Sequence, residues 1–168
     1  MEPAVRIRKL LDELIQNSRT LSAELSPRVL YTHGLASALH WLKDHKLKKY
    51  GLTLHVEADP ADDPDGEDAQ VLLFDLVREL LLNVVKHAGT DEAWVRLARP
   101  NPERLELVVE DRGHGFDPDA IDREGPGESG FGLSGMGDRL AAIGGTLTVD
   151  TAPGEGTRVT LSLHGPSG

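Results

Sequence analysis

The sequence predicts an α/β protein, a two-layer sandwich in which helices cover one face of a mixed sheet that N-terminal helices precede. The apolar residues follow helical and strand periodicity in the order helix, helix, strand, helix, two strands, helix, two strands. Short turns rich in Gly, Pro and Asn join the paired strands, which is typical of hairpins. Only 4% of the residues are aromatic and 39% are hydrophobic, so we expect an aliphatic core.

Two helices are expected before the first strand. Apolar residues at helical spacing over 5–25 predict the first helix. Ser26 and Pro27 suit an N-cap and a first helical position, so a second helix is expected from there to about Tyr50-Gly51.

The rest of the chain alternates strands and helices. We expect strands over 52–57, 93–98, 104–110, 146–151 and 157–163, and helices over 68–87 and about 134–143. The longer of these helices stops at Ala88-Gly89, where glycine is the usual C-terminal residue. A dinucleotide-binding fold and a P-loop are disfavoured, because the chain has neither a Gly-x-Gly-x-x-Gly between strand and helix nor a Walker A Lys-Ser/Thr.

Composition excludes several classes of protein. The formal net charge of −10 argues against a general nucleic-acid binder, and the absence of cysteine excludes disulfides and thiolate chemistry. Residues 1–50 carry +4 and residues 51–168 carry −14, which indicates two units with different partners or a mildly basic solvated helix face. No apolar run is long enough for a membrane span, and the start lacks a secretory signal, so a cytoplasmic location is expected.

One stripe of the long helix is polar. At 100° per residue, Asn83 lies about 40° round the helix from Glu79, Lys86 lies about 20° from it in the opposite direction, and His87 lies about 80° away. These groups suit a magnesium–phosphate site, because Mg²⁺ prefers oxygen ligands and keeps several waters. Lys86 could neutralise phosphate charge, and Glu79 could orient or deprotonate a nucleophile. Taken alone, the stripe fits the solvated face of an amphipathic helix at least as well.

A second candidate site follows the strand over 104–110. Asp111 stands at the strand end, where its carboxylate could accept a hydrogen bond from an exocyclic amine such as adenine N6. Gly113 and Gly115 would let the backbone approach a flat ring closely. The alternative is a loop that needs positive φ at these two glycines.

A third candidate site is the glycine-rich stretch 130–137. Its first glycines, Gly130 and Gly132, come just before the helix expected from about Ser134. The exposed N–H groups at the start of that helix could hold phosphate. The polar stretch 116–129 ahead of it is interpreted as a lid that closes over a ligand. An ordinary long loop is the alternative, although loops of this length in compact domains are usually functional or disordered.

Together, in this order, these motifs resemble those of the Bergerat-type ATPases, which include gyrase B, MutL, a heat-shock chaperone and the sensor histidine kinases. The N box, G1 box, G2 box and G3 turn are matched by ELLLNVVKHA (79–88), DRGHG (111–115), GFGL (130–133) and GEGT (154–157). The resemblance covers roughly residues 50–164 and implies an ATP-binding fold.

Two further stretches resemble histidine kinases that pair with response regulators of the NarL class: GLSGMGDR (132–139) before Gly144-Gly145, and RTLSAELSP (19–27) with Gly34-Leu35 and Ala38-Leu39. The stretch 19–27 is similar to part of dimerisation helix 2. The resemblance implies that residues 1–26 are a remnant of that helix and that 27–168 form the catalytic ATP-binding domain, with an ATP lid at about 116–129. It also implies a homodimer through a four-helix bundle in the full-length protein. A monomer stays open for this chain, which keeps one of the two helices.

The resemblance implies the following roles. Asn83 holds Mg²⁺, Asp111 binds adenine, and Glu79 assists phosphoryl transfer to a histidine. The remaining ATP-binding residues are expected to be Lys86 and His87 at the phosphates, Gly130 and Gly132 beside the triphosphate, Thr157 at the adenine pocket, and Gly113, Gly115 and Leu133. Leu133, Phe131 and Met136 are expected to pack rather than to act as polar ligands.

The family's phosphoacceptor histidine is followed by an acidic residue, and none of the seven histidines here is. The chain is therefore expected to be a fragment, or to act in trans on a phosphoacceptor helical domain, with a response regulator receiving the phosphoryl group. Autophosphorylation is not expected. Two alternatives are an ATP-sensing interaction module without turnover and an anti-sigma-factor-type serine kinase. The Leu-Ser-Pro27 helix and the Gly135-Met136 segment speak against the serine kinase.

Overall fold

The computed structural model describes residues 27–45, 47–119 and 128–165, and the first expected helix, over 5–25, lies outside them. The elements in chain order are α2 (Arg28–His45), η1 (Lys48–Tyr50), β1 (Thr53–Glu57), η2 (Pro60–Asp62), α3 (Glu67–Asn83), η3 (Val84–Ala88), β2 (Glu92–Asn101), β3 (Arg104–Asp111), α5 (Glu128–Ala141), β4 (Gly145–Thr151) and β5 (Thr157–His164). Among these helices, none combines the length and the apolar character that a bilayer span requires.

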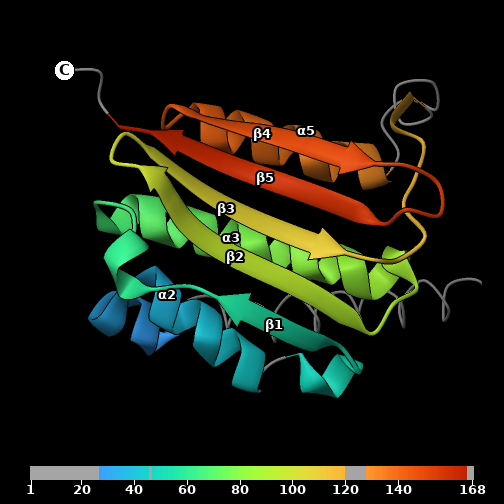
Figure 1. Ribbon diagram of the computed structural model, residues 1–168, viewed down its shortest axis with the longest axis horizontal. Coiled ribbons are helices and arrows are strands. Elements are labelled where there is room, and N and C mark those ends of the chain that lie inside the picture. The colour runs from blue at the N-terminus through green and yellow to red at the C-terminus, as the bar shows by residue number, and fades with distance from the viewer. Residues whose placement is uncertain (1–26, 46, 120–127, 166–168) are drawn as a thin grey trace, which may run out of the picture.

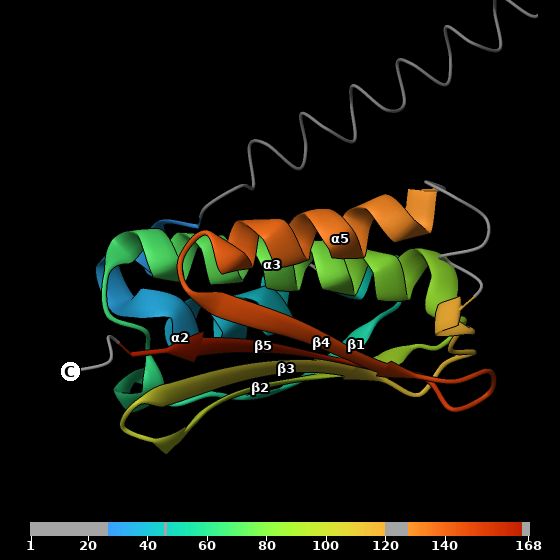
Figure 2. The same cartoon turned by 90° about the horizontal axis from the view of Figure 1, so that it is seen from above.

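The described strands form one five-stranded sheet in the order β1-β2-β3-β5-β4. β1 pairs with β2 in parallel and the other neighbours pair antiparallel, so the sheet is mixed. Figure 1 shows the strands side by side, and Figure 2 shows α2, α3 and α5 together on one face of the sheet. The predicted two-layer α/β sandwich is confirmed.

The core lies between the helix layer and the sheet and is aliphatic, as predicted. On β3 every second residue is buried, at Leu105, Leu107 and Val109, because alternate side chains of a strand point to opposite faces. Phe74 of α3 is fully buried and belongs to the same core cluster as leucines of α2, α3 and α5. Complete burial of one such side chain contributes about 1.5–3 kcal/mol, so the apolar stripes fix the helices to the sheet.

Helix α2 differs from its prediction at both its middle and its end. Gly34 has non-helical angles (φ 88°, ψ −177°), and the helix restarts after it with the Ala36 N–H donating to Oδ1 of Asp63 at 2.7 Å. The helix ends at His45 and not near Tyr50-Gly51. The chain turns earlier because the carbonyl of buried Leu47 accepts the N–H of Tyr50, which leads the backbone into β1.

Helix α5 begins at Glu128, so the predicted glycine-rich loop ahead of a helix from Ser134 is wrong. The apolar residues Leu133, Met136 and Leu140 explain the longer helix. They share one helix face that starts before Ser134, and Met136 and Leu140 are buried in the core. Packing of that face outweighs the low helix propensity of the glycines.

Candidate functional site

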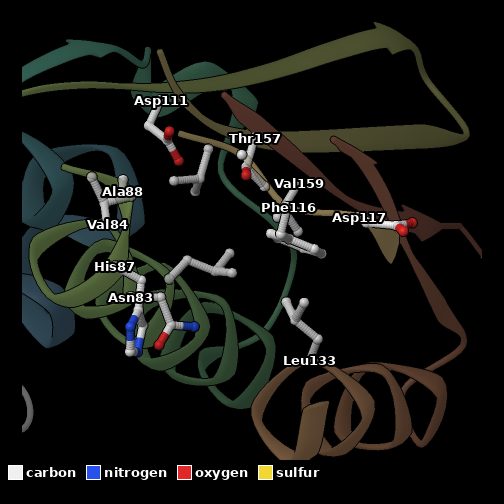
Figure 3. Close-up of a pocket in the computed structure, with 13 residues that line it drawn as sticks. Asn83, Val84, His87, Ala88, Asp111, Phe116, Asp117, Leu133, Thr157 and Val159 are labelled. Atoms are coloured by element: carbon white, nitrogen blue, oxygen red, sulfur yellow. The ribbon is translucent and has the colours of Figure 1, made fainter. Parts of the chain in front are cut away.

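A cavity of about 380 Å³ lies between the end of α3, the sheet and α5. This volume is in the range of small-molecule binding sites. Figure 3 shows side chains from each of these elements around it. The described lining residues are Leu80, Asn83, Val84, His87, Ala88, Val109, Asp111, Gly115, Phe116, Asp117, Leu133, Thr157 and Val159.

The cavity brings together residues from all three stretches that the sequence singled out, and from the G3 turn. The predicted site residues that line it are Asn83, His87, Asp111, Gly115, Leu133 and Thr157. Glu79, Lys86, Gly113 and Gly132 are not among the described lining residues. Gly130 lies in the first turn of α5, so it belongs to the start of a helix and not to a loop before one.

The end of the long helix is a π-helical turn. Helix α3 continues into η3 at Val84 and stops at Ala88, where Gly89 takes the left-handed conformation (φ 65°, ψ 30°). π-turns inside α-helices are frequent at functional sites. The polar stripe was predicted with α-helical spacing throughout the helix. A π-turn has more residues per turn, so the side chains after Asn83 point in other directions than expected. His87, not Lys86, therefore lines the cavity together with Asn83. Figure 3 shows the side chains of Asn83 and His87 on the same side of the helix.

Asp111 is the buried carboxylate of the cavity, with 6% of its surface exposed. It is the last residue of β3, and its Oδ1 accepts the N–H of Gly113 at 2.8 Å. Burial raises the pKa of the Asp111 carboxyl above its ordinary value of 3.8, and the backbone N–H groups of Gly113 and Thr157 partly oppose this shift. A buried acceptor that faces a cavity favours a ligand with an N–H donor.

Gly113 serves a contact within the protein rather than the cavity. A Cβ atom there would overlap the carbonyl oxygen of Ala88 and would come within 2.7 Å of its carbonyl carbon. The next residue, His114, donates its N–H to the same carbonyl oxygen at 2.7 Å. The end of β3 is thereby tied to the end of η3. Of the two glycines considered for positive φ, only Gly115 has it, at 58°.

The segment after Asp111 is also tied to the G3 turn. A Cβ on Gly115 would overlap the carbonyl oxygen of Ala152, and the Phe116 N–H donates to Oγ1 of Thr151 at 3.1 Å. Thr151 donates in turn to the Gly156 carbonyl at 2.9 Å. The start of the predicted lid therefore has a fixed base, and the part of the lid over 120–127 lies outside the described residues.

Glu79 stands one helical turn before Asn83 and forms an ion pair across to α5. Nη1 of Arg139 lies 3.3 Å from Oε2 of Glu79, and both side chains are nearly half exposed. Gly132 is close by, since the Glu79 carboxylate is the group nearest to a Cβ built there, at 3.9 Å. The sequence placed Glu79 on the polar stripe but gave no signal for its partner.

The donor set near the cavity suits a metal ion that shares its ligands with a nucleotide. Among the residues that the structure describes, no cluster of three or more His, Asp or Glu side chains could hold a metal by itself. The Asn83 carboxamide lines the cavity and provides one hard oxygen. Mg²⁺ is commonly bound through one or two protein oxygens plus phosphates and waters, and this arrangement fits that pattern.

Several lining residues were not predicted as site residues. They are mainly apolar: Leu80, Val84, Ala88, Val109, Phe116, Asp117 and Val159. The apolar members were expected on the inward faces of the long helix and of two strands, but periodicity alone does not separate a cavity wall from a filled core. Phe116 and Asp117 follow directly after Gly115, and that position is the signal that could have identified them.

The family match and two similar relatives agree with each other. Residues 68–167 match the model of the histidine kinase-, DNA gyrase B- and HSP90-like ATPases. A sensor-like histidine kinase of Chloroflexus aurantiacus is 36% identical over 85% of this chain and 24% of its own length. The signal transduction histidine-protein kinase/phosphatase UhpB of Salmonella typhimurium is 37% identical over 86% of this chain and 27% of its own length.

Solved structures show the same fold. The blue-light activated histidine kinase EL346 of Erythrobacter litoralis matches with a TM-score of 0.67 and 22% identity, over 91% of this chain and 49% of that one. The mycobacterial sensor histidine kinase MprB matches with a TM-score of 0.53 and 22% identity, over 76% of this chain and 91% of that one. The chain spans about a quarter of the length of the two curated relatives. On the family match over residues 68–167, this chain belongs to the histidine kinase-, DNA gyrase B- and HSP90-like ATPase family.

Proposed function

We propose that this chain is the catalytic ATP-binding domain of a two-component sensor histidine kinase. In this proposal it binds Mg-ATP and transfers the γ-phosphoryl group to a histidine of a phosphoacceptor helical domain. One observation carries it: residues from α3, η3, β3, β5 and α5 converge on one cavity that has a buried carboxylate, that of Asp111, and a half-buried amide, that of Asn83.

The adenine is assigned to the deep part of the cavity. Asp111 would accept a hydrogen bond from the exocyclic amine, while Val84, Ala88 and Val109 would contact the faces of the ring. Thr157 lies directly across from Asp111 in the register of β3 and β5 and completes the polar wall. Gly115 supports the pocket through its backbone turn.

The triphosphate is assigned to the rim between η3 and α5. Asn83 would bind Mg²⁺, which neutralises phosphate charge when present, and Lys86 and His87 would add positive charge or N–H donors. Gly130 belongs to the first turn of α5, where N–H groups without helical partners can bind anions, and Gly132 follows in the next turn. Leu133 would close the cavity with an apolar contact.

Glu79 is assigned to the transfer step. The acceptor imidazole nitrogen attacks the γ-phosphorus, the bond from this phosphorus to the bridging oxygen breaks, and ADP leaves. Glu79 would orient the imidazole and accept the proton that the attacking ring loses. A response regulator then receives the phosphoryl group on an aspartate, and the GLSGMGDR stretch (132–139) favours a regulator of the NarL class.

The proposal includes the organisation of the longer protein. Residues 1–26 are assigned to dimerisation helix 2 and residues 27–168 to the catalytic domain, with the ATP lid at about 116–129, although residues 128 and 129 already belong to α5. The full-length protein would be a homodimer through its helical domain. The catalytic domain would act in the cytoplasm.

The test combines binding with transfer. Calorimetric titration with Mg-ATP measures the affinity, and γ-labelled ATP with a separate polypeptide carrying an acceptor histidine helix measures acid-labile label on that helix. We expect both binding and labelling, and we expect Glu79→Gln to retain binding while labelling falls. Binding without any labelling would favour an ATP-sensing interaction module, label that is stable to acid would favour a serine kinase, and no binding would exclude all three.

A further inference from the structure

We infer that Thr151, which no ATP-binding motif includes, is a positioning residue that sets the base specificity of the cavity by fixing the hydroxyl of Thr157 as a hydrogen-bond acceptor. The inference rests on the proposed function, because it assigns a determinant of the nucleotide that the cavity takes.

A row of three paired residues crosses three strands of the sheet. Asp111 of β3 pairs with Thr157 of β5, and Thr157 pairs with Thr151 of β4. Directly opposed residues of antiparallel strands present their side chains on the same face. Asp111 and Thr157 line the cavity, and Thr151, on the next strand, is not among the described lining residues. Figure 3 shows Asp111 and Thr157 on the same wall.

The hydroxyl of Thr151 has its single hydrogen committed to one partner. A threonine hydroxyl has one hydrogen to donate and two lone pairs to accept with. The Phe116 N–H can only donate to Thr151 Oγ1, at 3.1 Å. The Gly156 carbonyl oxygen can only accept from Thr151 Oγ1, at 2.9 Å, so the single hydrogen of Thr151 is used there.

The hydroxyl of Thr157 is oriented by Thr151. Its Oγ1 lies 3.0 Å from Oγ1 of Thr151. Since Thr151 has no hydrogen left, the hydrogen of this bond must come from Thr157. The hydroxyl of Thr157 therefore has only lone pairs to present to the cavity.

The consequence is a polar wall that only accepts hydrogen bonds. Next to Thr157 stands Asp111, whose ionised carboxylate also has no hydrogen to donate. Such a wall matches a purine with an amino group at position 6, which has N–H donors. A purine with a carbonyl at position 6 would place a further acceptor oxygen against these acceptor oxygens, so this oxygen stays unpaired and only the N1–H of the ring can donate to the wall.

The experiment compares two nucleotides that differ at one ring edge: in the inosine nucleotide a carbonyl replaces the amino group at position 6, and N1 carries a hydrogen. Calorimetric affinities for Mg-ATP and for the magnesium complex of inosine 5′-triphosphate are measured on the wild type and on Thr151→Val. The valine keeps the size of the side chain and removes the hydroxyl, so Thr157 is free to turn and donate. We expect the preference for ATP over the inosine nucleotide to fall by about five- to tenfold.

Two controls separate specificity from stability. Thr151→Ser retains the hydroxyl and should restore the wild-type preference. Thr148→Val makes the same substitution at another position of the same strand, outside the hydrogen-bonded row, and should leave the preference unchanged. A loss of affinity for both nucleotides by the same factor in Thr151→Val would overturn the inference, because it would show a merely structural role.

Thr157→Val keeps the test decisive if Thr151→Val does not fold. Thr151 acts through the Thr157 hydroxyl, so an unchanged preference in Thr157→Val overturns the inference as well. A wild type that binds ATP without preferring it over the inosine nucleotide also overturns it, while the proposed ATP binding stands. A wild type that binds neither nucleotide refutes the proposed function and the inference together.

Discussion

Arg139 of α5 donates a hydrogen bond from Nη1 to Oε2 of Glu79 on α3, across 3.3 Å. The two residues are 60 positions apart in the chain, and they connect α3 to α5, which lie next to each other in Figure 2 and both contribute residues to the cavity. In the proposed reaction Glu79 has to meet the acceptor imidazole, so this ion pair holds the reactive carboxylate in one orientation at the rim.

The ion pair is expected to contribute little to stability. Both side chains are nearly half exposed, and pairs of this kind typically contribute about 0.2–1 kcal/mol. A double-mutant cycle with Glu79→Gln and Arg139→Gln, measured by urea unfolding, should give a coupling free energy in that range that decreases with added salt. The exposed pair of Arg96 and Glu57, at 3.7 Å, provides the matched cycle. A coupling above about 2 kcal/mol would contradict the expectation.

Asn83→Ala should abolish the magnesium-dependent part of nucleotide binding, because it removes the protein oxygen that is assigned to the metal. Calorimetric titration with ATP in the presence of Mg²⁺, and again with a chelator, measures this part directly. Asn101→Ala, on the exposed end of β2, is the control and should bind as the wild type does. Unchanged affinity for Mg-ATP in Asn83→Ala would refute the assignment of Asn83.

Two glycine substitutions should shift stability in opposite directions. In Gly113→Ala the new methyl group would overlap the Ala88 carbonyl, so we expect a loss of about 1–3 kcal/mol in the free energy of unfolding. In Gly137→Ala nothing lies within 4 Å of the new methyl group inside α5, so we expect a gain of about 0.5–1 kcal/mol. Urea unfolding of both variants measures this contrast, and a shift of the same sign in both would contradict it.

The Asp111 carboxyl should make stability depend on pH in the acid range. Its pKa in the folded protein is raised above 3.8 by burial, so between these two values the folded state binds more protons than the unfolded state. The contribution of the Asp111 carboxyl to the free energy of unfolding is therefore highest at low pH. It falls as the pH rises from 3.8 through the raised pKa of the folded protein. Asp111→Asn has no such titration.

The corresponding measurement is urea unfolding of the wild type and Asp111→Asn from about pH 7 down to about pH 3.5. We expect the variant to gain stability relative to the wild type as the pH rises, and to lose affinity for Mg-ATP. Burial also raises the pKa values of Asp63 and Asp75, but both are present in each protein and cancel in the difference. A stability difference that does not change with pH would contradict the prediction.

Most of the fold follows from local sequence patterns. Strand alternation placed β3 and β5 to within one residue at each end, because a half-buried strand needs an apolar residue at every second position. The end of the long helix at Ala88 was also predicted, since Gly89 takes the left-handed conformation that glycine adopts without strain. The start of α5 was wrong, because glycines suggested a loop where the packing of Met136 and Leu140 maintains a helix.

By itself, the sequence determined the order of helices and strands and the stretches that meet at the site, since both depend on residue types at short, regular spacing. Only the tertiary structure decided which side chains reach the cavity. Because of the π-turn, His87 lines the cavity and Lys86 does not. Contacts between distant segments pair Arg139 with Glu79, and they place Thr151 within hydrogen-bond distance of Phe116 and Thr157. The bonds from Arg139 to Glu79 and from Phe116 to Thr151 join residues 60 and 35 positions apart, and no local pattern encodes a partner at that distance.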